Sequence, residues 1–127
     1  MGRPAPNATG VGNVHSSYAE ILDDSAVESR SRESRAMRLS ITAMEEADAD
    51  RANPGKRATA IYTVSRLWSA LLEDIASPQN AYPAELKAQI ISIGIFILRE
   101  CEALRRDTRR DFETLTEICR IIEKGLA

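Results

Sequence analysis

Apolar residues recur every three or four positions in four stretches of the chain, which is the spacing of one face of an α-helix. The clearest stripe occupies the stretch from about residue 56 to residue 76. Its members are Ile61, Val64, Trp68, Leu71 and Ile75. An Asn-Pro-Gly turn precedes this stretch, and Ser-Pro, Asn and Pro residues between positions 77 and 83 follow it. Because proline disfavours the helical conformation of the residue before it, we expect a helix that ends near Ala76.

The next stretch, from Pro83 to about Arg106, is apolar on more than one side. One stripe consists of Leu86, Ile90, Ile93, Ile97, Cys101 and Leu104, and further apolar residues are Ile91, Ile95, Phe96 and Leu98. A helix that is apolar most of the way round either lies centrally or has a second partner. Gly94 at its middle costs about 1 kcal/mol relative to alanine, so we expect a neighbour to approach closely there, with Trp68 as the candidate.

Two further helices complete the prediction. The first begins after Asp24 or Ser25 and reaches about Ala47, but its apolar stripe covers only its second half: Met37, Ile41 and Met44. The last follows a polar joint at residues 107–110, with the stripe Phe112, Leu115, Ile118, Ile122 and Leu126. Short connections favour antiparallel neighbours. The sequence therefore predicts an all-α protein, a compact bundle of four helices.

The N-terminal segment is set apart from this bundle by its composition. Residues 1–14 contain Gly, Pro, Asn and Ala with little apolar periodicity, which predicts a flexible extension. Residues 15–127 then form the helical domain. Tyr18, Ile21 and Leu22 make a small apolar cluster, which we expect to dock loosely on the bundle as a short extended or single-turn element.

Composition and charge narrow the function. The 127 residues are 43% hydrophobic and 28% charged, and the net charge of −2 provides no general attraction to nucleic acid or anionic membranes. Cys101 and Cys119 lie in apolar stripes without a CxxC partner, as buried free thiols do. No secretory segment is recognised, and the longest uncharged run, residues 88–98, is too short to span a bilayer. We expect a cytoplasmic protein without membrane insertion.

The sequence offers no catalytic or metal-binding arrangement. Its one histidine, His15, lies in the N-terminal stretch without a nearby cysteine. A nucleophile, base and orienting acid cannot be assembled, and a phosphate-binding glycine motif is absent. We therefore expect neither an enzyme nor a cofactor or metal.

Two arginine-rich clusters bear on nucleic-acid binding. Residues 105–110 carry a local charge of +3 from Arg105, Arg106, Arg109 and Arg110 against one aspartate, and residues 28–38 carry +2. Neither cluster has the lysine tract or aromatic platform that accompanies single-stranded binding. The four arginines are a candidate basic contact patch, for which a solvated face or an acidic protein partner is favoured over direct RNA contact.

The surplus of apolar residues on the 83–106 helix is more informative. The first helix supplies few apolar residues in its first half, so an undersupplied helix facing an oversupplied one would leave a groove for another amphipathic helix. Alternatively, Tyr18, Ile21 and Leu22 cover the surplus within the same chain. The two can coexist if a partner displaces the N-terminal segment.

A series of short matches along the chain resembles one protein family. The matching residues are Leu67-Trp68, Asp74, Ala76-Ser77-Pro78, Asn80, Pro83, Leu86 and Ser92-Ile93-Gly94, with Tyr18-Ala19 upstream and Glu100 downstream. In this order and spacing they resemble the FlaF family of flagellar biosynthesis regulators, over residues 18–126. The chain departs from the pattern in a longer N-terminal extension and in Phe96, where the family has Trp.

The resemblance implies a non-enzymatic protein that acts on flagellin synthesis and export. The leading hypothesis is a flagellin-binding chaperone or adaptor. The alternative is a post-transcriptional regulator of flagellin mRNA acting with the companion protein FlbT, with or without direct RNA contact. Candidate protein-binding residues are Trp68, Asp74, Asn80, Ile91, Ile95, Phe96 and Leu98. The sequence does not decide whether Trp68 is a core or a site residue. For Asp74, a hydrogen bond to the 77–80 loop is favoured over a surface contact.

Overall fold

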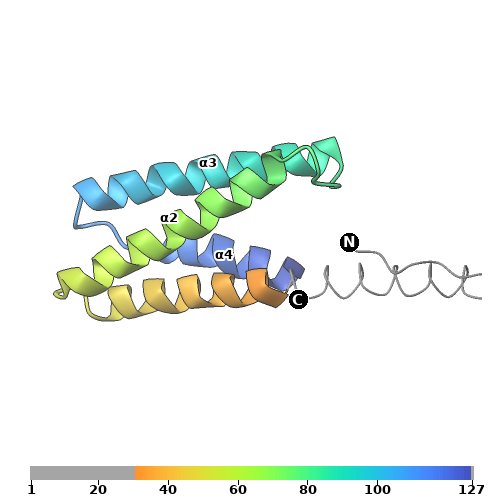
Figure 1. Ribbon diagram of the computed structural model, residues 1–127. Coiled ribbons are helices and arrows are strands. Elements are labelled where there is room, and N and C mark those ends of the chain that lie inside the picture. The colour runs from red at the N-terminus through yellow and green to blue at the C-terminus, as the bar shows by residue number, and fades with distance from the viewer. Residues whose placement is uncertain (1–30, 127) are drawn as a thin grey trace, which may run out of the picture.

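The computed structural model describes residues 31–126 and shows a bundle of helices (Figure 1). Residues 31–49 form the first helix, followed by α2 (Pro54–Ala76), α3 (Ala84–Arg106) and α4 (Glu113–Leu126). The prediction of an all-α fold with four helices is confirmed. The expected start of the first helix and the docked cluster at positions 18–22 lie outside the described residues.

Local hydrogen bonds explain where α2 begins and ends. The Asn53 side-chain oxygen accepts from the backbone N–H groups of Gly55 and Lys56 at 2.9 and 3.2 Å, which satisfies donors that have no partner within the helix. Pro54 occupies the first turn, where its missing N–H costs nothing. The helix therefore starts two residues before the expected Lys56, and it ends at Ala76, as the following Ser-Pro predicts.

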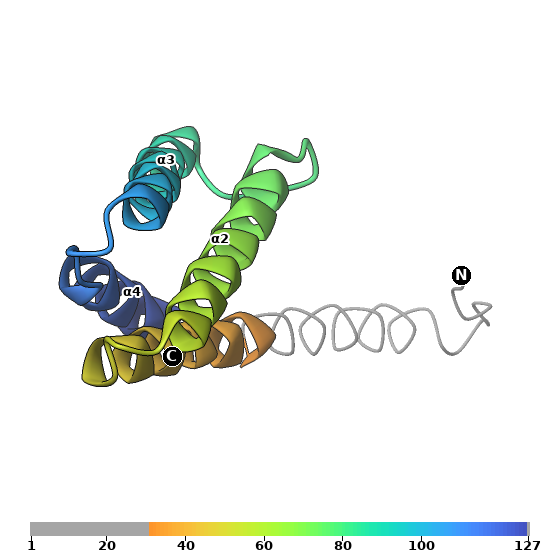
Figure 2. The same ribbon diagram turned by 90° about the vertical axis from the view of Figure 1, so that its left-hand side faces the viewer.

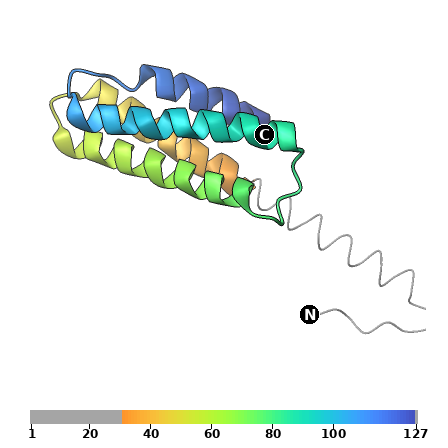
Figure 3. The ribbon, with the colours of Figure 1, turned by 90° about the horizontal axis from the view of Figure 1, so that it is seen from above.

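Successive helices run antiparallel, as the views from the side and from above show (Figures 1 and 3). The α2–α3 hairpin forms one pair that stays in contact. The first helix and α4 form the second pair, joined by ion pairs between Arg38 and Glu123 at 2.6 Å and between Arg120 and Glu45. None of the helices within residues 31–126 has a long enough apolar stretch to cross a membrane.

The core is built from one face of each helix. The bulkiest fully buried side chains are Trp68, Phe112, Met37, Met44, Ile97, Leu104 and Leu115. Trp68 is 0% exposed, so the structure decides in favour of its core role. Its indole N–H has no nitrogen or oxygen acceptor among the described residues. It lies near the thiol of Cys119, which is a weak acceptor.

Gly94 lies at the α2–α3 contact, but its close neighbour is Leu72 rather than the expected Trp68. A Cβ atom at position 94 would come within 2.6 Å of Leu72 Cδ2 and 2.9 Å of Leu72 Cγ. The Leu72 side chain therefore fills the space that any larger residue at position 94 would need. The prediction of a close approach is confirmed, while its assignment to Trp68 is wrong.

One end of the bundle, which we call the closed end, is tied together by polar contacts to the α3–α4 loop. Arg57 of α2 donates to the backbone carbonyls of Leu104, Asp107 and Arg110, each at 2.9 Å. The Asp48 carboxylate accepts the Phe112 N–H at 3.0 and 3.1 Å. These bonds satisfy backbone carbonyls at the end of α3 and a backbone N–H just before α4, so they hold the two helix ends together at the closed end.

From the closed end, the two helix pairs draw apart. Figure 1 shows α3 and α4 close together at their connecting loop and separated toward the C-terminus of α4. Figure 2 views the bundle from the closed end, and there α3 and α4 separate with increasing distance from the viewer. The opposite end, which we call the open end, holds the 77–83 loop and residue 31 of the first helix.

Candidate functional site

An apolar groove of about 390 Å³ lies between α3 and α4 on the side of the open end. Its walls are Ser92, Ile93 and Phe96 from α3, and Ile118, Ile121 and Ile122 from α4. Phe96 is 42% exposed and Ile121 is 69% exposed. No charged side chain lines the groove. A contiguous exposed apolar surface of this kind is typical of a site that contacts another protein.

The position of the groove differs from the prediction in one respect. The sequence placed its second wall on the undersupplied first helix, but the structure places it on α4. The reason is the divergence of α3 and α4, which leaves Ile93 and Ile118 only half buried. Ile121 was missed as a site residue. The sequence contained an indication of this role, because Ile121 is apolar although it lies outside the apolar stripe of the last helix.

The apolar surplus of α3 divides between two surfaces. Phe96 faces the groove toward α4. Ile95 and Leu98 instead line a shallow hollow toward α2, together with Ser65, Ser69, Arg99, Glu102 and Arg105. Ile91 is half buried and, at one turn before Ile95, lies on the same side of the helix. Of the predicted α3 site residues, the structure therefore places one in the apolar groove and the others away from it.

Asp74 lies in the last turn of α2, and Asn80 lies in the 77–83 loop at the open end. The Asn80 side-chain amide donates to the Asp74 carboxylate at 3.3 Å, and its oxygen accepts from the Tyr82 N–H at 2.9 Å. The Ser77 N–H also donates to the Asp74 backbone carbonyl at 3.1 Å. The favoured prediction, that Asp74 bonds to this loop, is confirmed.

The basic patch is largely neutralised by carboxylates of the same chain. Arg105 pairs with Glu102, Arg109 with Asp107 at 3.0 Å, and Arg110 with Glu100 at 2.8 Å. Hydrogen bonds from Arg109 hold the pKa of the Asp107 carboxyl below its ordinary value. Arg106 has no ion-pair partner among residues 31–126. A phosphate ligand would compete with a carboxylate at three of the four arginines, so the patch is a weak electrostatic site.

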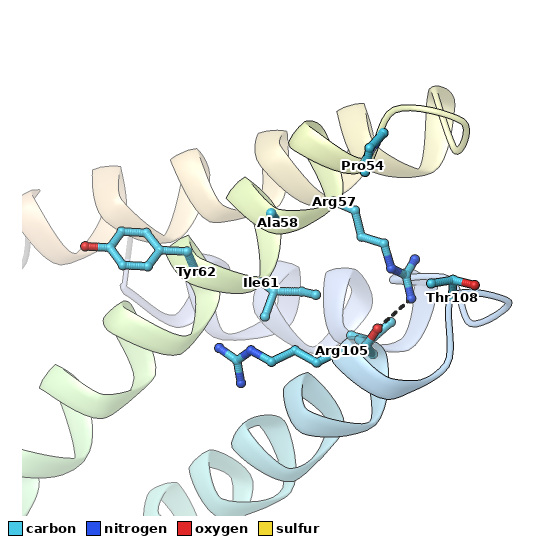
Figure 4. A pocket seen from close by; sticks show the side chains of 8 residues that line it. Pro54, Arg57, Ala58, Ile61, Tyr62, Arg105 and Thr108 are labelled. Atoms are coloured by element: carbon cyan, nitrogen blue, oxygen red, sulfur yellow. Dashed lines mark hydrogen bonds between the residues drawn. The ribbon is translucent and has the colours of Figure 1, made fainter.

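A second hollow of about 390 Å³ lies at the closed end between α2 and α3. Figure 4 shows Arg57 reaching across it to the end of α3, while the Arg105 side chain extends toward Ile61. Besides its bonds to three carbonyls, the Arg57 guanidinium lies 5.5 Å from the centre of the Phe112 ring. These contacts occupy the guanidinium within the chain and give Arg57 a structural role.

The two thiols lie in the core. Cys101 and Cys119 are both free and 0% exposed, and burial raises the pKa of each thiol. Raised pKa values keep thiols in the unreactive protonated form. Within the described part of the chain, no group of three or more His, Cys, Asp or Glu side chains is arranged to hold a metal ion.

Comparisons with known proteins gave one match, to a protein family. Neither the curated proteins nor the solved structures gave a match. The family model described as "Flagellar protein FlaF" matches residues 14–126. This match covers nearly the whole chain, including every helix of the bundle and both walls of the groove. The chain therefore belongs to the FlaF family and is a flagellar protein.

Proposed function

We propose that this protein binds newly made flagellin in the cytoplasm and promotes its accumulation and export, as a non-enzymatic chaperone or adaptor. The observation that carries the proposal is the α3–α4 groove, an exposed surface whose lining is apolar except for Ser92. Membership of a flagellar family supports a flagellar ligand. The resemblance described above supports flagellin as that ligand.

The shape and chemistry of the groove suit an amphipathic helix. Two diverging helices present apolar side chains on both walls, with Phe96 and Ile121 exposed at the rim. A helix with anchors at positions i, i+3 or i+4, and i+7 would bury them between these walls. Each fully buried aliphatic anchor contributes about 1.5–3 kcal/mol. Flagellin segments with exposed apolar stripes, which would otherwise associate with one another, fit this description.

The alternative function is regulation of flagellin mRNA together with FlbT. The basic patch gives little support for direct contact between this chain and RNA. Three of the four arginines in the basic patch already have carboxylate partners. In our proposal, any action on mRNA passes through FlbT, and this chain contributes protein contacts.

A pair of matched substitutions tests the flagellin proposal. Ile121→Asp places a charge in the groove, and Leu39→Asp places the same charge on the first helix, outside it. The two side chains are 69% and 67% exposed, so both variants should fold with little loss of stability. We expect Ile121→Asp to weaken binding to purified monomeric flagellin at least tenfold in a calorimetric titration. Leu39→Asp should bind like the unmodified chain. Equal affinities for all three proteins would remove the groove from the binding site.

A further inference from the structure

Two neighbouring hollows between α2 and α3 form a second surface depression. One lies at the closed end and the other lies beside Ile95, and Arg105 lines both of them. Figure 4 shows the Arg105 side chain extending from α3 toward Ile61 of α2. We call the two hollows together the α2–α3 furrow, and its walls are formed within residues 54–69 and residues 95–108. The furrow therefore follows about three turns of α3.

The α2–α3 furrow and the apolar groove lie on different sides of α3. Ile95, Leu98 and Glu102 line the furrow and are spaced as i, i+3 and i+7, so they share one side of the helix. Phe96 lines the groove, and at 3.6 residues per turn it lies about a third of a turn away from that side. A ligand in one depression therefore leaves the other accessible.

The floor of the furrow is apolar and partly exposed. Ile95 is 42% exposed and Tyr62 is 60% exposed, while Leu98 is half buried. Within residues 31–126, no side chain covers this strip completely. An exposed apolar strip between two packed helices can receive the apolar face of a third helix.

The charge of the furrow distinguishes it from the uncharged groove. Three arginines line it, Arg57, Arg99 and Arg105, against one carboxylate, Glu102, so its lining has a formal charge of +2. Glu102 pairs with Arg105, and Arg57 donates to loop carbonyls. Arg99 is exposed and has no ion-pair partner within residues 31–126. Its guanidinium is therefore available to a carboxylate of another molecule.

Arg66 adds a second available guanidinium at the α2 edge of the furrow. It lies one turn after Tyr62, donates to the Tyr62 hydroxyl at 3.2 Å, and lies 5.7 Å from the centre of that ring. None of the carboxylates in the described part of the chain pairs with it. Glu73 follows on this side of α2, but it lies beyond Ser69, where the lining ends. Arg66 and Arg99 thus place positive charge on both walls of the apolar floor.

We propose that the α2–α3 furrow binds an amphipathic helix of a second protein, in which Asp or Glu residues flank the apolar stripe. The floor receives the stripe, and Arg66 and Arg99 pair with the flanking carboxylates. Single-stranded nucleic acid fits less well, because it needs free aromatic faces for stacking. The exposed aromatic ring of the furrow, Tyr62, already carries the Arg66 guanidinium over it. This proposal does not depend on the ligand of the groove, and it allows the protein to hold two partners at once.

Two designed helical peptides with the same leucine stripe test the chemistry of the occupant. One carries Glu beside the stripe, and the other carries Lys at the same positions. We expect the acidic peptide to bind the 127-residue chain at least tenfold more tightly than the basic peptide in fluorescence anisotropy. The net charge of −2 favours the basic peptide, so unspecific attraction acts against the expected result. Equal affinities, or tighter binding of the basic peptide, would refute the proposal.

Charge reversal locates the bound peptide. Arg99→Glu changes the furrow, and Arg35→Glu makes the same change at an exposed position of the first helix. We expect Arg99→Glu to weaken binding of the acidic peptide at least tenfold, Arg99→Gln to weaken it less, and Arg35→Glu to change it less than twofold. Circular dichroism checks that each variant is folded. Equal weakening by Arg99→Glu and Arg35→Glu would contradict the proposal, as would loss of binding in Ile121→Asp, which changes only the groove.

The remaining measurements concern other occupants of the furrow. A dimer in sedimentation that is lost in Arg99→Glu would assign the furrow to a second copy of the chain. A single-stranded RNA that binds, and is lost in the same variant, would assign it to nucleic acid. Acidic-peptide binding that appears only after Asp23→Asn and Asp24→Asn would assign it to the N-terminal segment of the same chain. Each of these three results would overturn the proposal, whereas failure of flagellin to bind the groove would leave it standing.

Discussion

Replacing Gly94 with alanine places opposing effects at one position, and the structure predicts which one is larger. An alanine in the middle of a helix is favoured over glycine by about 1 kcal/mol. The added Cβ, however, would lie 2.6 Å from Leu72 Cδ2 and 2.9 Å from Leu72 Cγ. Overpacking of this kind typically costs about 1–3 kcal/mol. The difference means that Gly94→Ala should lower the free energy of unfolding by up to about 2 kcal/mol.

The same reasoning makes a sharper prediction for the double variant. Leu72→Ala removes the three atoms that lie within 3.0 Å of the added Cβ. In that background the helix propensity acts alone, so Gly94→Ala should stabilise by about 1 kcal/mol. Gly94→Ala is therefore favourable only in this background, and the interaction free energy in the cycle, which equals the overpacking cost, is about 1–3 kcal/mol.

Urea unfolding followed by far-ultraviolet circular dichroism measures all four proteins of this cycle. The slope of free energy against urea must stay equal among them, because a changed slope would indicate an altered unfolded state. Stabilisation by Gly94→Ala in the unmodified chain, or additive effects of the two substitutions, would show that Leu72 does not limit the space at Gly94. The close α2–α3 contact would then have another cause.

Two further predictions concern Arg57 and Glu33. Arg57→Ala should destabilise the protein by about 2 kcal/mol, because three carbonyls lose a charged donor. It should also speed hydrogen exchange in the 107–112 loop, and Arg57→Lys should not restore the lost stability. Unchanged exchange would show that Arg57 does not hold this loop in place. Burial and the nearby Asp74 raise the pKa of Glu33, while Arg32 opposes this shift. The ionised Glu33 carboxylate therefore lowers the stability of the fold at neutral pH. This loss of stability disappears as the pH falls through the raised pKa toward the ordinary glutamate pKa of 4.5. Glu33→Gln should raise the melting temperature at pH 7 and leave it unchanged near pH 4, and the opposite pH dependence would contradict this assignment.

Helix positions could be predicted from sequence because they depend on local chemistry. The Asn53-Pro54 start of α2 and the Ser77-Pro78 stop place signals within a few residues of the boundary they set. The apolar stripe through Val64 and Trp68 likewise marks the buried face directly. The connections are short, so antiparallel order followed as well.

The candidate site could be predicted only in part. The sequence identified α3 as the helix with surplus apolar residues, and Phe96 does line the groove. It could not identify Ile121 as the facing residue, since the pairing of α3 with α4 depends on contacts between distant parts of the chain. Nor could it show that Arg57 would hold the carbonyls of the α3–α4 loop, 47 to 53 residues away.

The sequence by itself determined the four helices, their buried faces and the family, because periodicity, capping residues and short motifs are local properties. Tertiary structure alone decided that Leu72 rather than Trp68 fills the space beside Gly94, and that the apolar surplus of α3 divides between Phe96, which faces α4, and Ile95 and Leu98, which face α2. Both outcomes depend on the angles at which helices cross. Those angles follow from the simultaneous packing of many side chains and from the hydrogen bonds at the closed end, which no single segment of the sequence encodes.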